Sequence, residues 1–165
     1  MAVVGLDLAA LSKNPTGFCL VNKESITKLL YSDEEIINEI EKYNPNIVAI
    51  DAPLSLPKGK AKERNVEKQI RKLGIGILSP SLPAMRKLAL RAISLKRKLN
   101  SKGITVIETF PYAVLQLNKL IAEKDAELKF NTKHERDAHI CALVAQAYVN
   151  GRAKKLGDRT GMIFY

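Results

Sequence analysis

Three short apolar segments that each end in an acidic residue constrain this chain more than any other feature. The segments are 3–6, 47–50 and 104–107, and the acids that follow them are Asp7, Asp51 and Glu108. Such near-continuous apolar runs are typical of strands buried on both faces of a parallel sheet. If the three strands lie side by side, their acids meet at one edge of the sheet. Crowded carboxylates repel one another, so a hard cation such as Mg²⁺ is their natural partner.

A simpler interpretation stands beside this one. An acid directly after a strand often caps the next helix or begins a turn. Either role accounts for any one of the three acids taken alone. The repetition of the pattern in three strands is what favours a shared site.

The segments between these strands predict how the chain connects them. Further strands are expected at 16–21 and 25–31, and their short link predicts an antiparallel meander with the first strand. Ser32 and Glu35 form a capping box for a helix that continues to residue 43. A strand at 46–51 follows, and strand, helix and strand in this order predict a parallel crossover. The predicted class is therefore α/β.

Length and composition limit the class of protein. The chain has 165 residues, enough for one domain, which we expect to span 1–165. No apolar stretch approaches about 18 residues, so no membrane span is expected. Cys19 and Cys141 lie in apolar surroundings and indicate buried thiols rather than a disulfide framework. These features predict a cytoplasmic protein that has no membrane partner.

The positive charge is concentrated in one segment. Residues 58–102 contain fourteen Lys and Arg against two acids, a net of +12, so the rest of the chain carries −2 of the total +10. We expect this segment to form a basic helical insertion, with helices at 58–73 and 82–100. Arg86, Arg91 and Arg97 lie beside the apolar stripe of the second helix. A basic segment indicates a polyanionic partner, DNA or RNA first. A solubilising lysine-rich surface is the alternative.

The last helix is expected to begin near His134. Asp137, Cys141, Val144 and Tyr148 follow at spacings of four, three and four, which places them on one stripe. Asp137 therefore faces the sheet with the apolar residues. An acid in the first turn also suits the helix dipole, but that role does not explain the inward direction.

The order of these elements resembles the ribonuclease H-like fold. The segments 4–7, 50–54, 64–74, 108–111 and 134–145 are similar to a family of uncharacterised predicted nucleases with that fold. The resemblance implies a mixed five-stranded sheet with a β-β-β-α-β core, flanked by helices. It also implies that Asp7, Asp51 and Asp137 hold two divalent metals, Mg²⁺ or Mn²⁺, and that Glu108 is a catalytic acid at the same site. The chain departs from the family at Glu67, where an aspartate is expected.

The last helix is also similar to that of Holliday-junction resolvases, in which two metal-facing positions lie three residues apart. This similarity implies that His134 is a metal ligand together with Asp137; a surface or capping role is the alternative. Arg64 and Arg71 are candidate phosphate contacts, because a guanidinium matches phosphate oxygens. A solvated helix surface explains them equally well.

The function that these features imply is two-metal hydrolysis of phosphodiester bonds. A kinase-like ATPase domain shares the core, but no glycine-rich phosphate loop follows Leu8. A non-catalytic nucleic-acid-binding module and a metal-dependent hydrolase of a small phosphorylated substrate remain alternatives. The choice between DNA and RNA, and between monomer and homodimer, stays open at this point.

Overall fold

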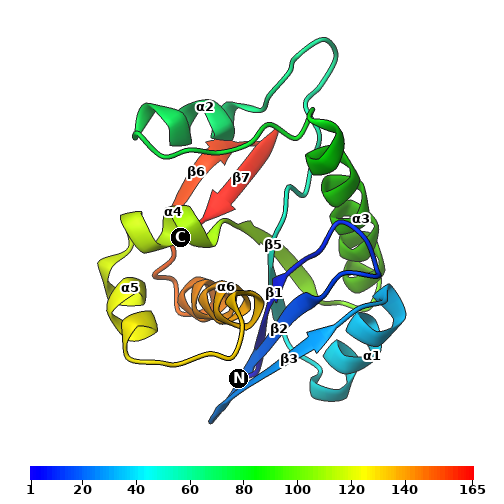
Figure 1. Cartoon of the computed structure of the whole chain (residues 1–165), viewed down its shortest axis with the longest axis vertical. Coiled ribbons are helices and arrows are strands. Elements are labelled where there is room, and N and C mark those ends of the chain that lie inside the picture. Colours follow the sequence, from blue (N-terminus) through cyan, green and yellow to red (C-terminus); the bar gives the residue numbers. More distant parts are fainter.

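A mixed sheet of seven strands runs through the middle of the molecule (Figure 1). The computed structural model describes all residues, 1–165. The strands lie in the order β3-β2-β1-β4-β5-β7-β6. They are β1 (Val3–Asp7), β2 (Thr16–Val21), β3 (Ser25–Leu30), β4 (Ile47–Asp51), β5 (Thr105–Thr109), β6 (Lys155–Asp158) and β7 (Gly161–Phe164).

Six helices cover the sheet. They are α1 (Asp33–Tyr43), α2 (Asn65–Lys72), α3 (Pro83–Asn100), α4 (Pro111–Leu117), α5 (Lys119–Ala126) and α6 (Lys133–Val149). None of these helices has the length and apolar character needed to span a bilayer. The Ser32–Glu35 capping box at the start of α1 is present as predicted.

The first five strands have the predicted connections. β1, β2 and β3 form an antiparallel meander, and β1, β4 and β5 are parallel neighbours. The α/β class is confirmed, but the prediction of five strands is wrong. β7 continues the sheet in parallel beside β5, and β6 pairs with β7 in antiparallel orientation. Both strands lie beyond the five that the resemblance implied.

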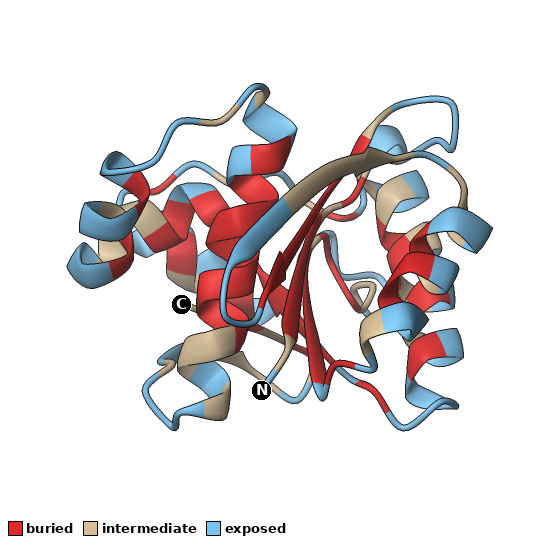
Figure 2. Ribbon diagram, turned by 90° about the horizontal axis from the view of Figure 1, so that it is seen from below, coloured by how far each residue is buried: buried red, intermediate tan, exposed pale blue.

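Two apolar cores lie on the two faces of the sheet (Figure 2). On one face, Leu6 and Ile50 pack with Leu95 of α3 and with side chains of α1. On the other face, α6 lies against the strands and is buried almost all round from Glu135 to Ala145. Because strand side chains alternate between faces, the odd-numbered residues of β1 and β4 face α6.

The basic insertion is divided between two parts of the molecule. α3 belongs to the main core through Ala92, Leu95 and Leu99. α2 instead packs through Val66 and Ile70 against β7 in a third, smaller core. One local expectation is wrong: residues 58–64, in the helix expected at 58–73, are not helical.

α6 approaches β1 and β2 unusually closely at two glycines. A Cβ atom on Gly17 would lie 1.9 Å from the backbone oxygen of His134, and one on Gly5 would lie 2.0 Å from that of Ala138. Only glycine allows backbones to approach this closely. The close approach fixes the first turn of α6 above the ends of the central strands, which positions the site.

Candidate active site

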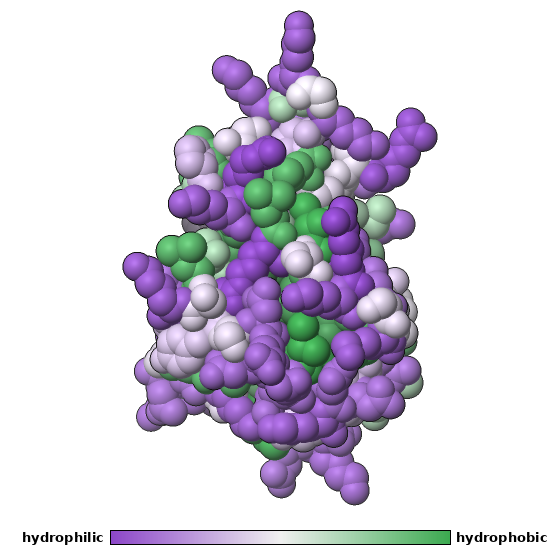
Figure 3. All heavy atoms as spheres, turned by 90° about the vertical axis from the view of Figure 1, so that its right-hand side faces the viewer, coloured by the Kyte–Doolittle hydropathy of each residue, from purple (hydrophilic) through white to green (hydrophobic).

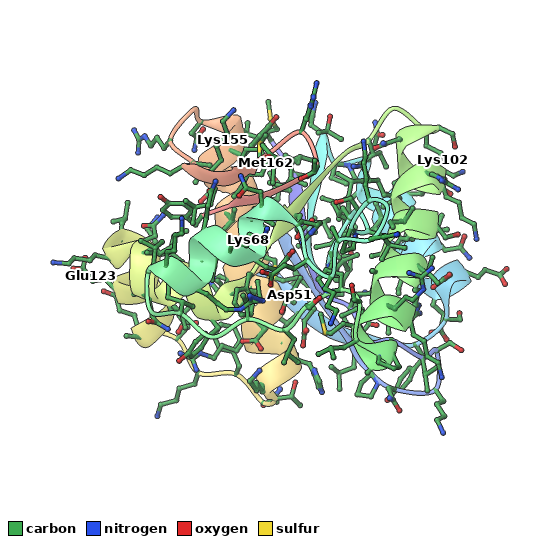
Figure 4. All side chains as sticks on the ribbon, turned by 90° about the horizontal axis from the view of Figure 1, so that it is seen from above. Asp51, Lys68, Lys102, Glu123, Lys155 and Met162 are labelled. Atoms are coloured by element: carbon green, nitrogen blue, oxygen red, sulfur yellow. The ribbon has the colours of Figure 1, made fainter.

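Asp7 and Asp51 end two adjacent parallel strands. The register pairs Leu6 with Ile50, so the two acids that follow lie next to each other on the face covered by α6. Both are partly exposed and line a cavity of about 710 Å³. Figure 4 shows Asp51 near the centre of the view, between α2 on one side and α3 on the other.

Asp137 lies in the first turn of α6, and its side chain is buried, with 10% exposure. Burial raises the pKa of Asp51 well above its usual value, and the negative charges of Asp7 and Asp137 raise that pKa further. Burial also raises the pKa of Asp7, although its hydrogen bond with His134 opposes the shift. The structure thus brings together the three acids that the sequence suggested, and their charges repel one another.

Two basic side chains of α6 accompany these acids. Lys133 donates a hydrogen bond from Nζ to Oδ2 of Asp137 at 2.6 Å. His134 Nδ1 lies 2.7 Å from Oδ2 of Asp7, within hydrogen-bonding distance. Asp51 has no such partner: only burial and neighbouring charges act on its carboxylate. His134 is therefore at the site, as predicted, but in contact with Asp7.

Glu108 lines the same cavity as Asp7 and Asp51, as expected, but its side chain leaves the sheet on the opposite face. The register pairs Glu108 with Ile50 and pairs Asp51 with Thr109, so Glu108 points away from the face that carries Asp7 and Asp51. Its carboxylate accepts two hydrogen bonds from Arg64, at 2.8 and 2.6 Å, and one from the backbone N–H of Leu54 at 2.8 Å. These hydrogen bonds give Glu108 a role in holding the loop after β4 and the start of α2.

Arg64 is buried and is not free to contact a phosphate. It also pairs with Glu67, whose carboxylate accepts a 2.7 Å hydrogen bond from the backbone N–H of Arg64 at the start of α2. The side chains of Arg64 and Glu67 are each 1% exposed. Glu67, the departure from the expected family pattern, is thus a structural partner of Arg64.

The other candidate phosphate-binding arginines fall into two groups. Arg91 donates 2.7 Å hydrogen bonds to Asp33 and to the backbone oxygens of Ala9 and Tyr31. Arg71 forms an ion pair with Glu63. Arg86 and Arg97 are exposed and form no ion pair within the chain. Only these last two remain free to contact a nucleic acid.

The cavity also has an apolar wall, which the sequence reasoning missed. Its side chains come from the segment before α3, from α3 itself and from the start of α4: Ile77, Leu78, Met85, Leu88, Phe110 and Tyr112. Leu78 and Tyr112 are exposed by 61% and 58%. On the face that carries α3, Figure 3 shows apolar atoms surrounded by hydrophilic side chains. The apolar residues of the glycine-flanked segment 74–80 are the signal that could have indicated this wall.

The carboxylates of Asp7, Asp51 and Asp137 suit a divalent metal in their chemistry but not in their present arrangement. No group of three or more His, Cys, Asp and Glu side chains is placed so that it could hold a metal ion. Asp7 and Asp137 instead contact His134 and Lys133. The three carboxylates are the hard oxygen donors that Mg²⁺ and Mn²⁺ prefer. One of them, Asp51, lacks any hydrogen-bonding partner.

Comparison with known proteins identifies the family. No curated protein matches the chain. The family model described as "Protein of unknown function (DUF429)" matches residues 5–135. The matched segment contains Asp7, Asp51, Glu108 and His134, and it ends two residues before Asp137. Because the match covers most of its length, the chain belongs to the family "Protein of unknown function (DUF429)".

Proposed function

We propose that this protein is a metal-dependent nuclease with a ribonuclease H-like fold, and that Asp7, Asp51 and Asp137 bind Mg²⁺ or Mn²⁺. The observation that carries the proposal is the carboxylate of Asp51. It lies in the cavity beside two other carboxylates and has no hydrogen-bonding partner. Asp51 is open only to the cavity, and a carboxylate that is largely shielded from water among like charges is costly unless a cation joins it.

The order and directions of the first five strands support the fold assignment. An antiparallel meander, then α1 and then β4 parallel to β1 give the order β-β-β-α-β, and β5 adds a fifth strand parallel to β4. On this proposal β7 and β6 extend that core at the edge beyond β5.

The chain's own residues would hold and orient the reacting groups. Bound divalent cations would supply a nucleophilic water and stabilise the leaving oxygen. Asp7 and Asp51 stand at the ends of central strands, which fixes their positions. His134 orients Asp7 across the 2.7 Å between Nδ1 and Oδ2. Lys133 lines the cavity and carries a charge that matches a substrate phosphate.

One observation favours a second candidate, a metal-dependent hydrolase of a small phosphorylated substrate. Arg64, Arg71 and Arg91 are engaged with groups of the protein itself. The surface available to a long phosphate backbone is therefore smaller than the charge of +10 suggests.

A non-catalytic binding module would leave the carboxylates without a cation to compensate them.

Hydrolysis assays with matched variants test these alternatives. Labelled single-stranded, duplex and branched DNA and RNA, and a chromogenic phosphodiester and phosphomonoester, are incubated with Mg²⁺, Mn²⁺ or EDTA. Asp51→Asn is compared with Glu123→Gln, which removes an exposed acid at the periphery of the molecule (Figure 4).

Metal-dependent cleavage of nucleic acid that is abolished in Asp51→Asn and retained in Glu123→Gln supports the nuclease proposal. Cleavage confined to the small phosphate esters supports the second candidate. A wild-type protein that shows no Mg²⁺ or Mn²⁺ binding by calorimetry contradicts both.

A further inference from the structure

The cavity combines two chemistries that a phosphate-binding surface alone does not need. Asp7, Asp51 and Lys133 line one part, and an apolar wall that includes Phe110 and Tyr112 lines another. We propose that the cavity binds one unstacked nucleotide, with its base on the apolar wall and its phosphate at the carboxylates. The proposed position of the phosphate rests on the proposed function, whereas the proposed position of the base rests only on the apolar wall of the cavity.

The size of the cavity suits such a ligand. Its volume of about 710 Å³ falls within the range of about 300–1,000 Å³ that is typical of small-molecule sites. The cavity is therefore large enough for one nucleotide unit, and a base would have to leave its stack to enter it, as bases do in enzymes that act on extruded nucleotides.

The aromatic part of the wall is fixed to the same sheet as the acids. Phe110 and Tyr112 flank Pro111, the first residue of α4, directly after β5. Their ring centroids lie 6.0 Å apart, and the ring planes are inclined by 52°. The exposed ring of Tyr112 is available to a base, and stacking on aromatic side chains is the common way in which proteins bind unstacked bases.

The rest of the wall comes from the segment that precedes α3 and from α3 itself. Ile77 and Leu78 lie in this segment, and Met85 and Leu88 lie in the first turns of the helix. Hydroxyl groups of Ser79 and Ser81 both donate hydrogen bonds to the backbone oxygen of Lys62. These bonds tie the segment to the loop before α2, so the apolar wall is formed in the ligand-free protein.

The polar end of the cavity argues against a purely apolar occupant. A lipid chain would leave Asp7 and Asp51 desolvated without compensation. A nucleotide instead offers a flat apolar face and, through its phosphate, a partner for Lys133 and for cations held by the acids. One nucleotide unit can come from a free nucleotide or from a strand, and the two sources share this chemistry.

Fluorescence of 2-aminopurine tests the base subsite without any catalytic readout, because stacking quenches this base. The probes are the 2-aminopurine nucleoside monophosphate and a tetranucleotide with one internal 2-aminopurine, each as DNA and RNA, in EDTA and in Mg²⁺. The variant is Tyr112→Ala, and the matched control is Tyr31→Ala, which removes an exposed tyrosine that does not line the cavity.

We expect saturable quenching of the monophosphate, and a saturable fluorescence change of the tetranucleotide, whose base is already partly stacked, with the wild type and with Tyr31→Ala. In Tyr112→Ala the affinity should be lower by about 5- to 150-fold, the range for removal of a base-stacking ring. Binding of the monophosphate identifies a free nucleotide as a sufficient ligand, whereas binding of the tetranucleotide alone identifies a strand. Equal affinities of Tyr112→Ala and wild type, or no saturable fluorescence change of any probe, would overturn the inference.

The two proposals can fail separately. Metal-dependent cleavage without a fluorescence change of any probe would remove the base subsite and leave the nuclease intact. A fluorescence change that depends on Tyr112, in a protein that binds no divalent metal, would keep the base subsite and remove the nuclease.

Discussion

Arg64 donates two hydrogen bonds to the carboxylate of Glu108, at 2.8 and 2.6 Å, and the two side chains are 1% and 5% exposed. The same guanidinium donates a 3.0 Å hydrogen bond to the hydroxyl of Ser55, which in turn donates one to the backbone oxygen of Thr160. The network joins the loop after β4, the start of α2, the end of β5 and the turn before β7. Arg64 and Glu108 line the same cavity as Asp7, so the network holds part of the cavity wall in place.

Replacing Arg64 by Met should destabilise the protein by about 3–5 kcal/mol, because Glu67 and Glu108 would remain buried without their shared cation. Urea unfolding followed by circular dichroism measures this decrease in stability. Arg86→Met is the control, since Arg86 is exposed and makes no ion pair, and it should change stability by less than about 0.5 kcal/mol. Abolished nucleic-acid binding by Arg64→Met at unchanged stability would instead make Arg64 a phosphate-binding residue.

Gly5→Ala should destabilise the protein by at least about 1–3 kcal/mol, as overpacking of a tightly packed position does. The new Cβ would lie 2.0 Å from the backbone oxygen of Ala138 and 2.3 Å from the backbone nitrogen of Ala142. α6 would have to move away from β1, and Asp137 would move with it. Gly76→Ala is the control, because no atom lies within 4 Å of its added Cβ. Equal urea midpoints for the two variants would contradict the close packing of α6.

The positions of Asp7, Asp51 and Asp137 could be predicted because each follows from a local pattern. Two apolar strands end at the first two acids, and helical spacing turns the third toward the sheet. Glu108 follows the same strand pattern but lies one register position earlier, opposite Ile50. A shift of one residue moves a side chain to the other face of a sheet, and no local pattern reveals the register between two parallel strands.

The buried arginines and the strand β6 could not be predicted for a related reason. Arg64 and Arg91 resemble surface residues in the sequence, and their partners Glu108, Asp33 and Tyr31 lie far away along the chain. β6 contains Lys155, Gly157 and Asp158 and has no apolar alternation, so it forms only because β7 offers a pairing edge. The cavity wall depends equally on segments that only the fold brings together.

Asp51→Asn should raise the melting temperature of the metal-free protein, and the increase should grow with pH. The pKa of Asp51 is raised in the folded state by burial and by Asp7 and Asp137. The folded protein therefore holds this proton more strongly than the unfolded chain. The stabilisation that comes from binding this proton is complete below the pKa of Asp51 in the unfolded chain, about 3.9. It is lost as the pH rises through the pKa of Asp51 in the folded protein. Above that pH the wild type carries an uncompensated charge that the variant lacks.

Differential scanning fluorimetry at several pH values in EDTA measures the difference between Asp51→Asn and the wild type. Added Mg²⁺ or Mn²⁺ should stabilise the wild type by mass action and leave the variant unchanged. Glu123→Gln should behave as the wild type throughout. A variant that is less stable than the wild type at every pH would give Asp51 a purely structural role.

Substitutions of the exposed arginines of α3 should weaken nucleic-acid binding, whereas substitution of the largely buried Arg91 should lower stability. Neutralising Arg86 and Arg97 should weaken nucleic-acid binding and flatten the dependence of log affinity on log salt by about one unit for each phosphate that is no longer bound. Stability should not change. Arg91→Ala should instead cost about 1.5–3 kcal/mol or more, because it removes charged hydrogen bonds to Asp33, Ala9 and Tyr31. Fluorescence anisotropy at several salt concentrations measures nucleic-acid binding, and urea unfolding measures stability. If the salt slope of the variant without Arg86 and Arg97 is unaltered, these arginines do not bind phosphates and serve only as a solubilising surface.

Lys133→Gln should tighten the binding of Mg²⁺ or Mn²⁺. The ammonium group donates a 2.6 Å hydrogen bond to Asp137, and this hydrogen bond is the main reason that the pKa of Lys133 is raised. Asp7 and Asp51 raise that pKa as well, so the lysine charge acts on all three acids. A bound divalent cation would compete with this charge for the same carboxylates.

Removing the competing charge should raise metal affinity by about 3- to 10-fold, since a partly solvated pair of charges is worth on the order of 1 kcal/mol. Without metal, the same variant should be slightly less stable than the wild type, because the acids lose their compensating neighbour. Isothermal titration calorimetry with each metal and melting curves in EDTA measure the two effects. Lys129→Gln, which removes an exposed lysine of the loop before α6, should change neither. Unchanged or weaker metal binding by Lys133→Gln would mean that Asp137 takes no part in holding the cation, and the metal site would then have to rest on Asp7 and Asp51 alone.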